Sequence, residues 1–277
     1  MNSMMNNFCV FILSHKRPEC DTLKMLKKYG YSGDYRVVLS TDDDYINEYK
    51  KSITNEKILI FDKQKVRHLC DTMISTYDFN PNGSIYARAF IQEKADEMGL
   101  DYFCMADDDI SKIYHREDVD SKMKQKEISN IDYVFLAFIE FLESDRRIAS
   151  INPALDDGFF GGVNGSFKQT ATRLPFQFFV FKTANKRKFV GLRSEDYNLS
   201  YLNTDLLYFT YWHLSIASPK MTTNSGGIDY TKSKKRLNPS MFMWLAHPIG
   251  IKVLPNEKRR IFKNKIFPQI VSDRFKK

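Results

Sequence analysis

The 277-residue sequence has little cysteine and no long apolar run. Its four cysteines, Cys9, Cys20, Cys70 and Cys104, show no C-x-x-C spacing, and three of them lie in or beside apolar segments. Reduced, mostly buried thiols in a cytoplasmic protein fit this pattern best. Apolar stretches such as Tyr133–Leu142 are too short or too interrupted to cross a bilayer, so we expect no membrane insertion.

Signal peptide, internal repeat and low-complexity linker are also missing. The first residues, MNSMMNN, have neither a basic region nor a long apolar region. Material for a core is abundant, since 43% of the residues are hydrophobic and 14% are aromatic. This composition excludes a disordered chain and predicts one large domain or two small ones.

Positive charge gathers at the end of the chain, although the formal net charge is only +8. Residues 218–277 carry 14 Lys or Arg and 3 Asp or Glu, a net of +11, which leaves the remainder slightly acidic. We expect a core over residues 1–217 and a basic segment over 218–277 that packs on it. Such clustering favours a polyanionic partner, with a solvated basic tail as the alternative.

Short apolar runs separated by polar turns predict alternating strands and helices. Strands are expected at Phe8–Leu13, Tyr35–Leu39, Lys57–Phe61, Tyr102–Met105, Ile148–Asn152 and Pro175–Lys182. Helices are expected at Asp21–Tyr29, at Ile85–Met98 with Ser84 as its cap, and at Ile131–Leu142. The alternation favours an α/β fold, a mainly parallel sheet with helices on both faces, whose ligands collect at the carboxyl ends of the strands.

Two of these strands end in three aspartates, in VVLSTDDDY and YFCMADDDI. In an extended segment the side chains of Asp107 and Asp109 point to one side and that of Asp108 to the other. Paired carboxylates repel each other unless a cation lies between them, and ligation by oxygen alone favours Mg²⁺ or Mn²⁺. A solvated acidic turn is the alternative.

Several segments, in order over roughly residues 8–205, resemble the GT-A fold of nucleotide-sugar glycosyltransferases. The first strand with SHKRP resembles the first strand and polar loop of that family. Residues Gly83–Ile110 resemble its donor-site helix, strand and D-x-D motif, and GLRSEDYNLSYL, Gly191–Leu202, resembles its E-D helix start. The chain looks most like the phage-type enzymes that glycosylate hydroxymethylated pyrimidines in DNA, relatives of the base-J glucosyltransferase.

This resemblance implies roles for individual residues. Asp107 and Asp109 hold Mn²⁺ or Mg²⁺, and Glu195 or Asp196 is the catalytic base; a helix start capped by Ser194 is the alternative for that pair. His247 is a candidate third metal ligand, although it lies later in the chain than the family pattern, as His213 lies earlier. The donor, a UDP-sugar with UDP-glucose expected first, is bound by Ser14, Lys16, Arg17, Asp42, Arg88, Asp107 and Asp108.

The first triplet has a different expected role. Asp42 accepts a hydrogen bond from a base N–H, most simply of uracil, while Asp43 and Asp44 cap the next helix. A plain helix cap formed by the whole triplet is the alternative.

The acceptor follows from the basic segment, and we expect DNA that contains a hydroxymethylated pyrimidine. Basic residues interleaved with aromatic ones bind phosphates and stack on bases. The expected contacts are Lys232, Lys234, Lys235, Arg236, Lys258, Arg259 and Arg260, and the loop Gly158–Phe167 is a candidate lid. A cell-surface polysaccharide or lipopolysaccharide glycosyltransferase and an inactive nucleic-acid-binding module on the same fold are the alternatives.

Overall fold

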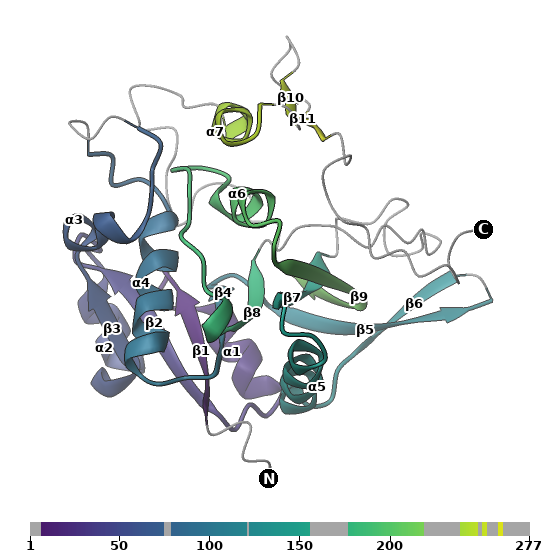
Figure 1. Ribbon diagram of the computed structural model, residues 1–277. Helices are drawn as coiled ribbons and strands as arrows, with labels where there is room; N and C mark the ends of the chain where they lie inside the picture. The colour runs from purple at the N-terminus through teal and green to yellow at the C-terminus, as the bar shows by residue number, and fades with distance from the viewer. Residues whose placement is uncertain are drawn as a thin grey trace.

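A computed structural model describes residues 7–74, 79–120, 122–155, 177–218, 239–248, 251–253 and 260–262. Strands and helices alternate through the first half of the chain (Figure 1). The strands are β1 (Phe8–Leu13), β2 (Asp34–Ser40), β3 (Ile58–Phe61), β4 (Tyr102–Asp107), β5 (Lys112–Val119), β6 (Lys122–Glu127), β7 (Ile148–Leu155), β8 (Phe178–Lys182), β9 (Leu207–Ala217), β10 (Ile251–Val253) and β11 (Arg260–Phe262). The α-helices are α1 (Asp21–Lys28), α2 (Ile46–Ser52), α3 (Lys63–Val66), α4 (Ile85–Glu97), α5 (Ile131–Glu143), α6 (Glu195–Leu202) and α7 (Pro239–Ala246).

Nine of the described strands form one sheet in the order β3-β2-β1-β4-β8-β7-β9-β5-β6. The first four strands in this order, β3, β2, β1 and β4, run parallel to one another. Beyond them β8 is antiparallel to both β4 and β7, β9 is parallel to β7, and the β5–β6 hairpin closes the sheet with antiparallel pairs. The α/β prediction is therefore confirmed, with a sheet that is parallel in its first half and mixed in its second, consistent with a Rossmann-like GT-A fold.

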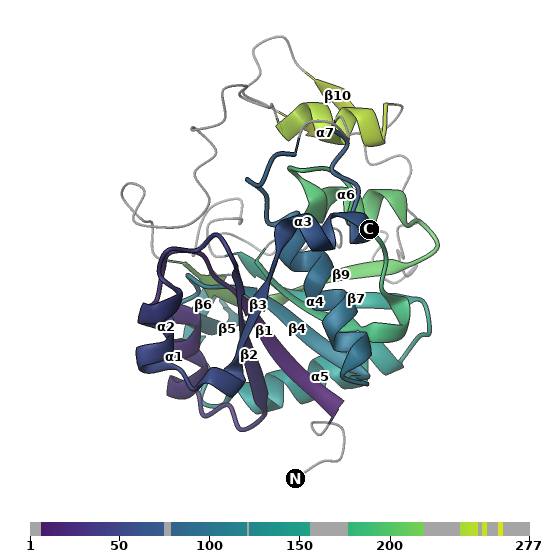
Figure 2. The ribbon, with the colours of Figure 1, turned by 90° about the vertical axis from the view of Figure 1, so that its left-hand side faces the viewer.

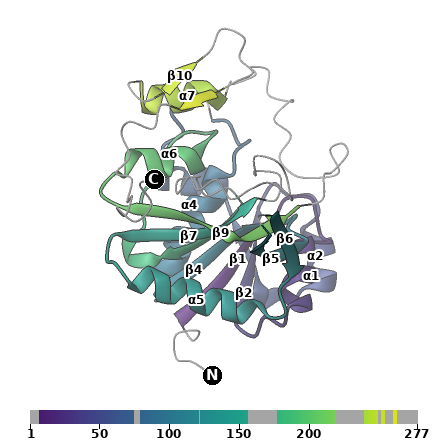
Figure 3. The ribbon, with the colours of Figure 1, turned by 90° about the vertical axis from the view of Figure 1, so that its right-hand side faces the viewer.

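Helices cover both faces of this sheet, as expected. Helix α4 lies in front of the sheet in Figure 2, and α5 lies in front of it in the opposite view of Figure 3. Strand β1 shows why its sequence is apolar throughout, since Phe8 and Val10 belong to the core under α1 and α5, whereas Cys9 and Phe11 belong to the core under α4. A strand buried on both faces has no polar side to alternate with.

All four cysteines are free and buried, as the sequence predicts. No helix of the described residues is long and apolar enough to span a membrane. In helix α7, Phe242 belongs to the core under α4, and Met243 is buried. The boundary predicted between residues 217 and 218 stays a prediction. Of the predicted DNA contacts, Arg260 begins β11 and pairs with Val253. The others, Lys232, Lys234, Lys235, Arg236, Lys258 and Arg259, lie outside the described residues, as does the loop Gly158–Phe167.

Candidate active site

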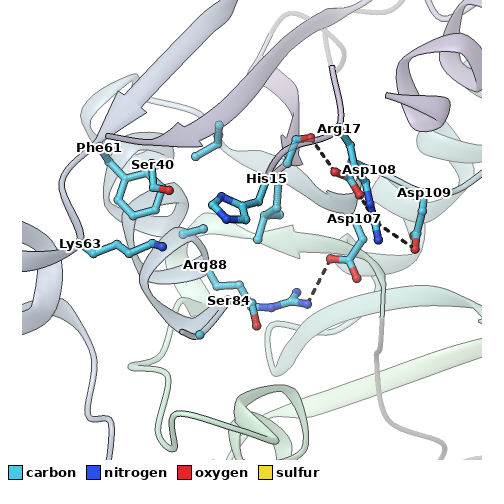
Figure 4. Close-up of a pocket in the computed structure, with 15 residues that line it drawn as sticks. His15, Arg17, Ser40, Phe61, Lys63, Ser84, Arg88, Asp107, Asp108 and Asp109 are labelled. Carbon is cyan, nitrogen blue, oxygen red and sulfur yellow. Dashed lines mark hydrogen bonds and ion pairs between the residues drawn. The ribbon is translucent and has the colours of Figure 1, made fainter. Parts of the chain in front are cut away.

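A pocket of about 290 Å³ opens at the carboxyl ends of the four parallel strands. Its lining comes from the residues that end or follow β1, β2, β3 and β4, and the first turn of α4 closes one side. This volume is at the lower end of the range for small-molecule sites. Figure 4 shows its side chains, and the lining is Leu13, Ser14, His15, Arg17, Val38, Ser40, Phe61, Lys63, Gly83, Ser84, Ala87, Arg88, Asp107, Asp108 and Asp109.

Asp108, the middle residue of the second triplet, is held by the loop after β1. Its carboxylate accepts hydrogen bonds of 2.6 Å from Ser14 Oγ and 2.8 Å from an Arg17 Nη. Tyr49 supports both partners, because its hydroxyl lies 2.6 Å from Ser14 Oγ and accepts a 2.8 Å hydrogen bond from the Arg17 backbone N–H. Burial raises the pKa of Asp108, against the pull of Ser14 and Arg17. Asp108 therefore fixes the loop that carries Arg17.

Asp107 contacts a different arginine, Arg88 of α4. An Nη of Arg88 lies 3.3 Å from Asp107 Oδ1, and its guanidinium lies over the Phe179 ring at 4.9 Å. Burial raises the pKa of Asp107 to about 7, and the neighbouring charges of Asp109 and Asp108 act in the same direction, whereas Arg88 opposes the rise. The position is therefore unfavourable for a lone carboxylate and favourable for one that has a cation beside it.

The donor atoms of the triplet fit a hard divalent cation. Asp109 is only loosely engaged, with an Arg17 Nη and the Ser218 hydroxyl each at 3.5 Å from its carboxylate. No group of three or more His, Cys, Asp or Glu side chains within the described ranges could hold a metal ion. A Mg²⁺ or Mn²⁺ ion would therefore rest on two carboxylates, Asp107 and Asp109, and on ligands from substrate and water, which is the usual Mg²⁺ pattern.

Among the described residues that line the pocket, no aspartate lies at the opposite end. Figure 4 shows Phe61, Ser40 and Lys63 there, with His15 between them and the triplet. Asp42 does not line the pocket; its carboxylate accepts a 2.9 Å hydrogen bond from Lys63 Nζ. Burial alone would raise the pKa of Asp42, but the hydrogen bonds from Ser40 and Lys63 outweigh it and lower that pKa.

The other two aspartates of the first triplet do not cap α2, contrary to the expectation. The N-cap of that helix is Tyr45, and no side chain makes the capping hydrogen bond. Asp43 is buried and accepts 2.8 Å hydrogen bonds from the backbone N–H groups of Lys16 and Tyr45. Asp44 is exposed and pairs with Lys16 Nζ at 2.8 Å, and Lys16 is not part of the pocket lining. Both carboxylates thus accept hydrogen bonds from Lys16 in the loop after β1, and neither caps α2.

Helix α6 brings the predicted Glu195 to Arg88. Glu195 is buried, and its Oε1 accepts hydrogen bonds from Arg88 Nε at 3.1 Å and from Ser84 Oγ. The Ser84 hydroxyl consequently does not cap α4, although Ser84 is its N-cap residue. Ser194 likewise makes no capping hydrogen bond and has a left-handed backbone, φ 58°, an uncommon conformation for a residue other than glycine.

Asp196 is placed differently from its neighbour. It is half-buried, and its carboxylate accepts a local hydrogen bond of 2.9 Å from the Tyr197 backbone N–H. Burial, followed by the charge of Glu195, raises the pKa of Asp196 to about 7. A carboxylate with this pKa takes up and releases a proton near neutral pH. The two acidic residues therefore differ in their surroundings. The Glu195 carboxylate is held by Arg88, whereas the Asp196 carboxyl group can exchange a proton near neutral pH.

Comparison with protein families gives a match over residues 8–227, which contain the whole pocket and α6. The matching model is that of the TET-associated glycosyltransferases. The chain belongs to this family. It is therefore a glycosyltransferase, and the enzyme predicted from the sequence is confirmed. Among curated proteins, no sequence matches the chain.

In this glycosyltransferase the two late histidines lie away from the triplet. His247 packs against Tyr201 of α6, with ring centroids 5.5 Å apart, and its pKa is lowered by burial. The Nδ1 atom of His213, in β9, lies 3.3 Å from the Arg116 carbonyl oxygen. Neither histidine lines the pocket, so the structure does not bring the predicted third ligand to Asp107 and Asp109.

Two titratable residues that line the pocket of the glycosyltransferase are absent from the sequence-based set, His15 and Lys63. The side chain of His15 is 20% exposed, and its Nδ1 lies 3.5 Å from the buried Asp43 carboxylate. Burial lowers the pKa of His15, against the effect of Asp43. Each lies two positions after the last residue of a strand, His15 after β1 and Lys63 after β3. A polar residue at a strand end is the same signal that identified Ser14 and Asp107.

Proposed function

We propose that this glycosyltransferase transfers a sugar from a UDP-sugar, UDP-glucose first, to the hydroxyl group of a 5-hydroxymethylpyrimidine in DNA, with Mn²⁺ or Mg²⁺ as cofactor. The observation that carries the proposal is the set of contacts that runs from Asp107 in the pocket through Arg88 to Glu195 of α6, in a member of this family. Sugar transfer requires that the groups that bind the donor and the group that activates the acceptor lie on adjoining sides of a single site.

The donor occupies the pocket at the strand ends. Asp107 and Asp109 would hold the divalent ion, which would supply electrostatic stabilisation to a diphosphate leaving group. Arg17 lies beside the same carboxylates, at 2.8 Å from Asp108 and 3.5 Å from Asp109, so its guanidinium is placed to contact a phosphate oxygen. Arg88 fixes Asp107 from the protein side.

The acceptor hydroxyl gives its proton to Asp196. As that proton moves to the carboxylate, the hydroxyl oxygen forms a bond to the anomeric carbon of the sugar. The bond from this carbon to the diphosphate oxygen breaks, and UDP leaves with the electron pair. Asp196 suits the role better than Glu195, because the Glu195 carboxylate is already bound by Arg88 and Ser84.

A modified base of DNA is the acceptor that the family name favours, because the name couples the glycosyltransferase with TET. The charge distribution supports it, since 14 of the 42 basic residues fall in the last 60 positions of the chain. Basic surface of this kind binds phosphates in a salt-dependent way. A base within a duplex is reached by flipping it out of the stack.

The test measures UDP release by the full chain with Mn²⁺ and UDP-glucose. Three acceptors are compared: DNA with 5-hydroxymethylcytosine, the same DNA with cytosine, and a bacterial polysaccharide. Release that requires the hydroxymethylated DNA, and that EDTA abolishes, supports the proposal. Equal release with and without that DNA, or release only with the polysaccharide, would reject the DNA acceptor. Release that survives EDTA would reject the metal.

A further inference from the structure

We propose that Lys63 selects the donor nucleotide by donating a hydrogen bond to the carbonyl oxygen at C4 of a pyrimidine, and that Asp42 positions its ammonium group. The inference rests on the proposed function, because it requires that the pocket bind a nucleoside diphosphate. It reverses the role expected for this region, where Asp42 itself would accept a hydrogen bond from the base.

The first step concerns the direction in which a nucleotide lies. The aspartate triplet and Arg17 lie at one end of the pocket, and Phe61, Ser40 and Lys63 lie at the other (Figure 4). A diphosphate held at the triplet end therefore leaves the base for the Lys63 end. The wall there is fixed, because Phe61 is buried and stacks on Phe90 with ring centroids 5.1 Å apart.

The second step concerns hydrogen bonding at that end. The Lys63 side chain is 11% exposed, and in the described part of the chain its ammonium makes one hydrogen bond, of 2.9 Å, to Asp42. An ammonium has three N–H donors and no acceptor, so two donors remain for a ligand. Asp42 is 50% exposed and is not part of the pocket lining, so it holds the Lys63 ammonium without presenting its own carboxylate to the base.

The third step is the match to a base edge. Uracil and thymine present a carbonyl oxygen at C4, where cytosine presents an amino group that only donates. Two donors facing each other leave both hydrogen bonds unmade in a largely buried position, which costs more than a hydrogen bond to water would. The site consequently favours a uridine or thymidine diphosphate over a cytidine diphosphate of nearly the same shape.

Calorimetric titration of the full chain with UDP and with CDP, both with Mn²⁺ present, tests the inference. The wild-type protein is expected to bind UDP about 10- to 100-fold more tightly than CDP, the range for a hydrogen bond to a charged group. Lys63→Met is expected to bring the two dissociation constants within about threefold of each other, mainly by weakening the binding of UDP. Lys63→Gln, whose amide can also accept from cytosine, is expected to improve CDP binding.

Matched controls separate this effect from a general change of charge. Lys65→Met removes an exposed lysine from the same helix and should leave the ratio unchanged. Asp42→Asn should lower the ratio partly, whereas Asp44→Asn, which neutralises an exposed aspartate two residues away, should not. Melting curves of each variant show that it is folded.

Three results would overturn the inference: equal binding of UDP and CDP by the wild-type protein, the same loss of both nucleotides in Lys63→Met, which would indicate a phosphate contact, or no binding of either nucleotide to folded wild-type protein. The assay needs no acceptor, so it is independent of transfer. A UDP preference that Lys63→Met abolishes, in a protein that modifies no DNA, would keep the inference and reject the acceptor.

Discussion

Arg88 and Glu195 form a buried ion pair, 3.1 Å from Nε to Oε1, that ties α4 to α6 at the floor of the pocket. The same guanidinium reaches Asp107 at 3.3 Å, so one positive charge lies between the candidate metal ligand and the helix of the candidate base. The two negative charges, led by Asp107, raise the pKa of Arg88 against the effect of its burial. The proposed donor and acceptor sides of the site are thus joined through a single side chain.

Replacement of Arg88 by methionine should destabilise the protein by about 3 kcal/mol or more, because it leaves buried carboxylates without their counterion. The free energy of unfolding from urea titration measures the effect. Arg147→Met serves as the control: its partner Asp145 lies at 2.7 Å, but the Arg147 side chain is 58% exposed, so a much smaller loss than for Arg88→Met is expected. Equal losses of unfolding free energy in the two variants would show that the buried Arg88–Glu195 ion pair contributes no more to stability than an exposed one.

Asp196→Asn should abolish sugar transfer while UDP binding stays close to that of the wild-type protein, because the substitution removes the proton acceptor and leaves the donor pocket intact. Glu195→Gln should instead reduce stability together with turnover, since it removes the charge that pairs with Arg88. Single-turnover rates and UDP affinity, measured on both variants, separate the two roles. Normal transfer by Asp196→Asn would exclude Asp196 as the base.

Transfer should increase with pH around neutrality. The carboxyl group of Asp196 has its pKa raised to about 7 by burial and by Glu195, and only its ionised form can accept a proton. Below this pKa the proton is already in place and the rate should fall about tenfold for each pH unit. A profile of kcat/KM at saturating Mn²⁺, from about pH 5 to about pH 9, measures the dependence. A flat profile across pH 7 would contradict it.

Asp109→Asn should weaken Mn²⁺ binding far more than Asp108→Asn does. The Asp109 carboxylate can take a metal ion, because its contacts with Arg17 and Ser218 are long, at 3.5 Å. The Asp108 carboxylate already accepts short hydrogen bonds from Ser14 and Arg17. Asp108→Asn should lower the free energy of unfolding by about 1–3 kcal/mol, because it disturbs a charged, buried hydrogen-bond network. Titration with Mn²⁺ followed by electron paramagnetic resonance gives the affinities. Equal weakening in both variants would mean that the triplet acts as one unit.

The parts of the fold that surround the pocket could be predicted from the sequence because they are buried on both faces. Strands β1 and β4 read as unbroken apolar runs, and the polar residues after them mark the edge where ligands collect. The hairpin of β5 and β6 was not anticipated, since its second strand is KMKQKE. An edge strand carries charges that protect it from pairing with other chains, and its apolar pattern is weak.

The site divides in the same way. Asp107, Arg88 and Glu195 were each singled out from the sequence, but the contacts of Arg88 with the two carboxylates were not predicted. The partner of Asp42 could not be read from the sequence, because it is a lysine of another strand end, 21 positions away. Polar residues near the end of a strand compete for one another through space, and only the folded structure shows which pair wins. The rule that identified the first two strand ends would have found Lys63 if applied to the third.

The most direct test of the proposed activity is the intact mass of a DNA duplex that carries one 5-hydroxymethylcytosine, recorded after incubation with the full chain, Mn²⁺ and UDP-glucose. The account predicts a gain of one hexose on that strand with the wild-type protein and no gain with Asp109→Ala or Asp196→Asn. An unchanged DNA mass while the wild-type protein binds UDP would contradict the acceptor, and a full gain with either variant would contradict the site.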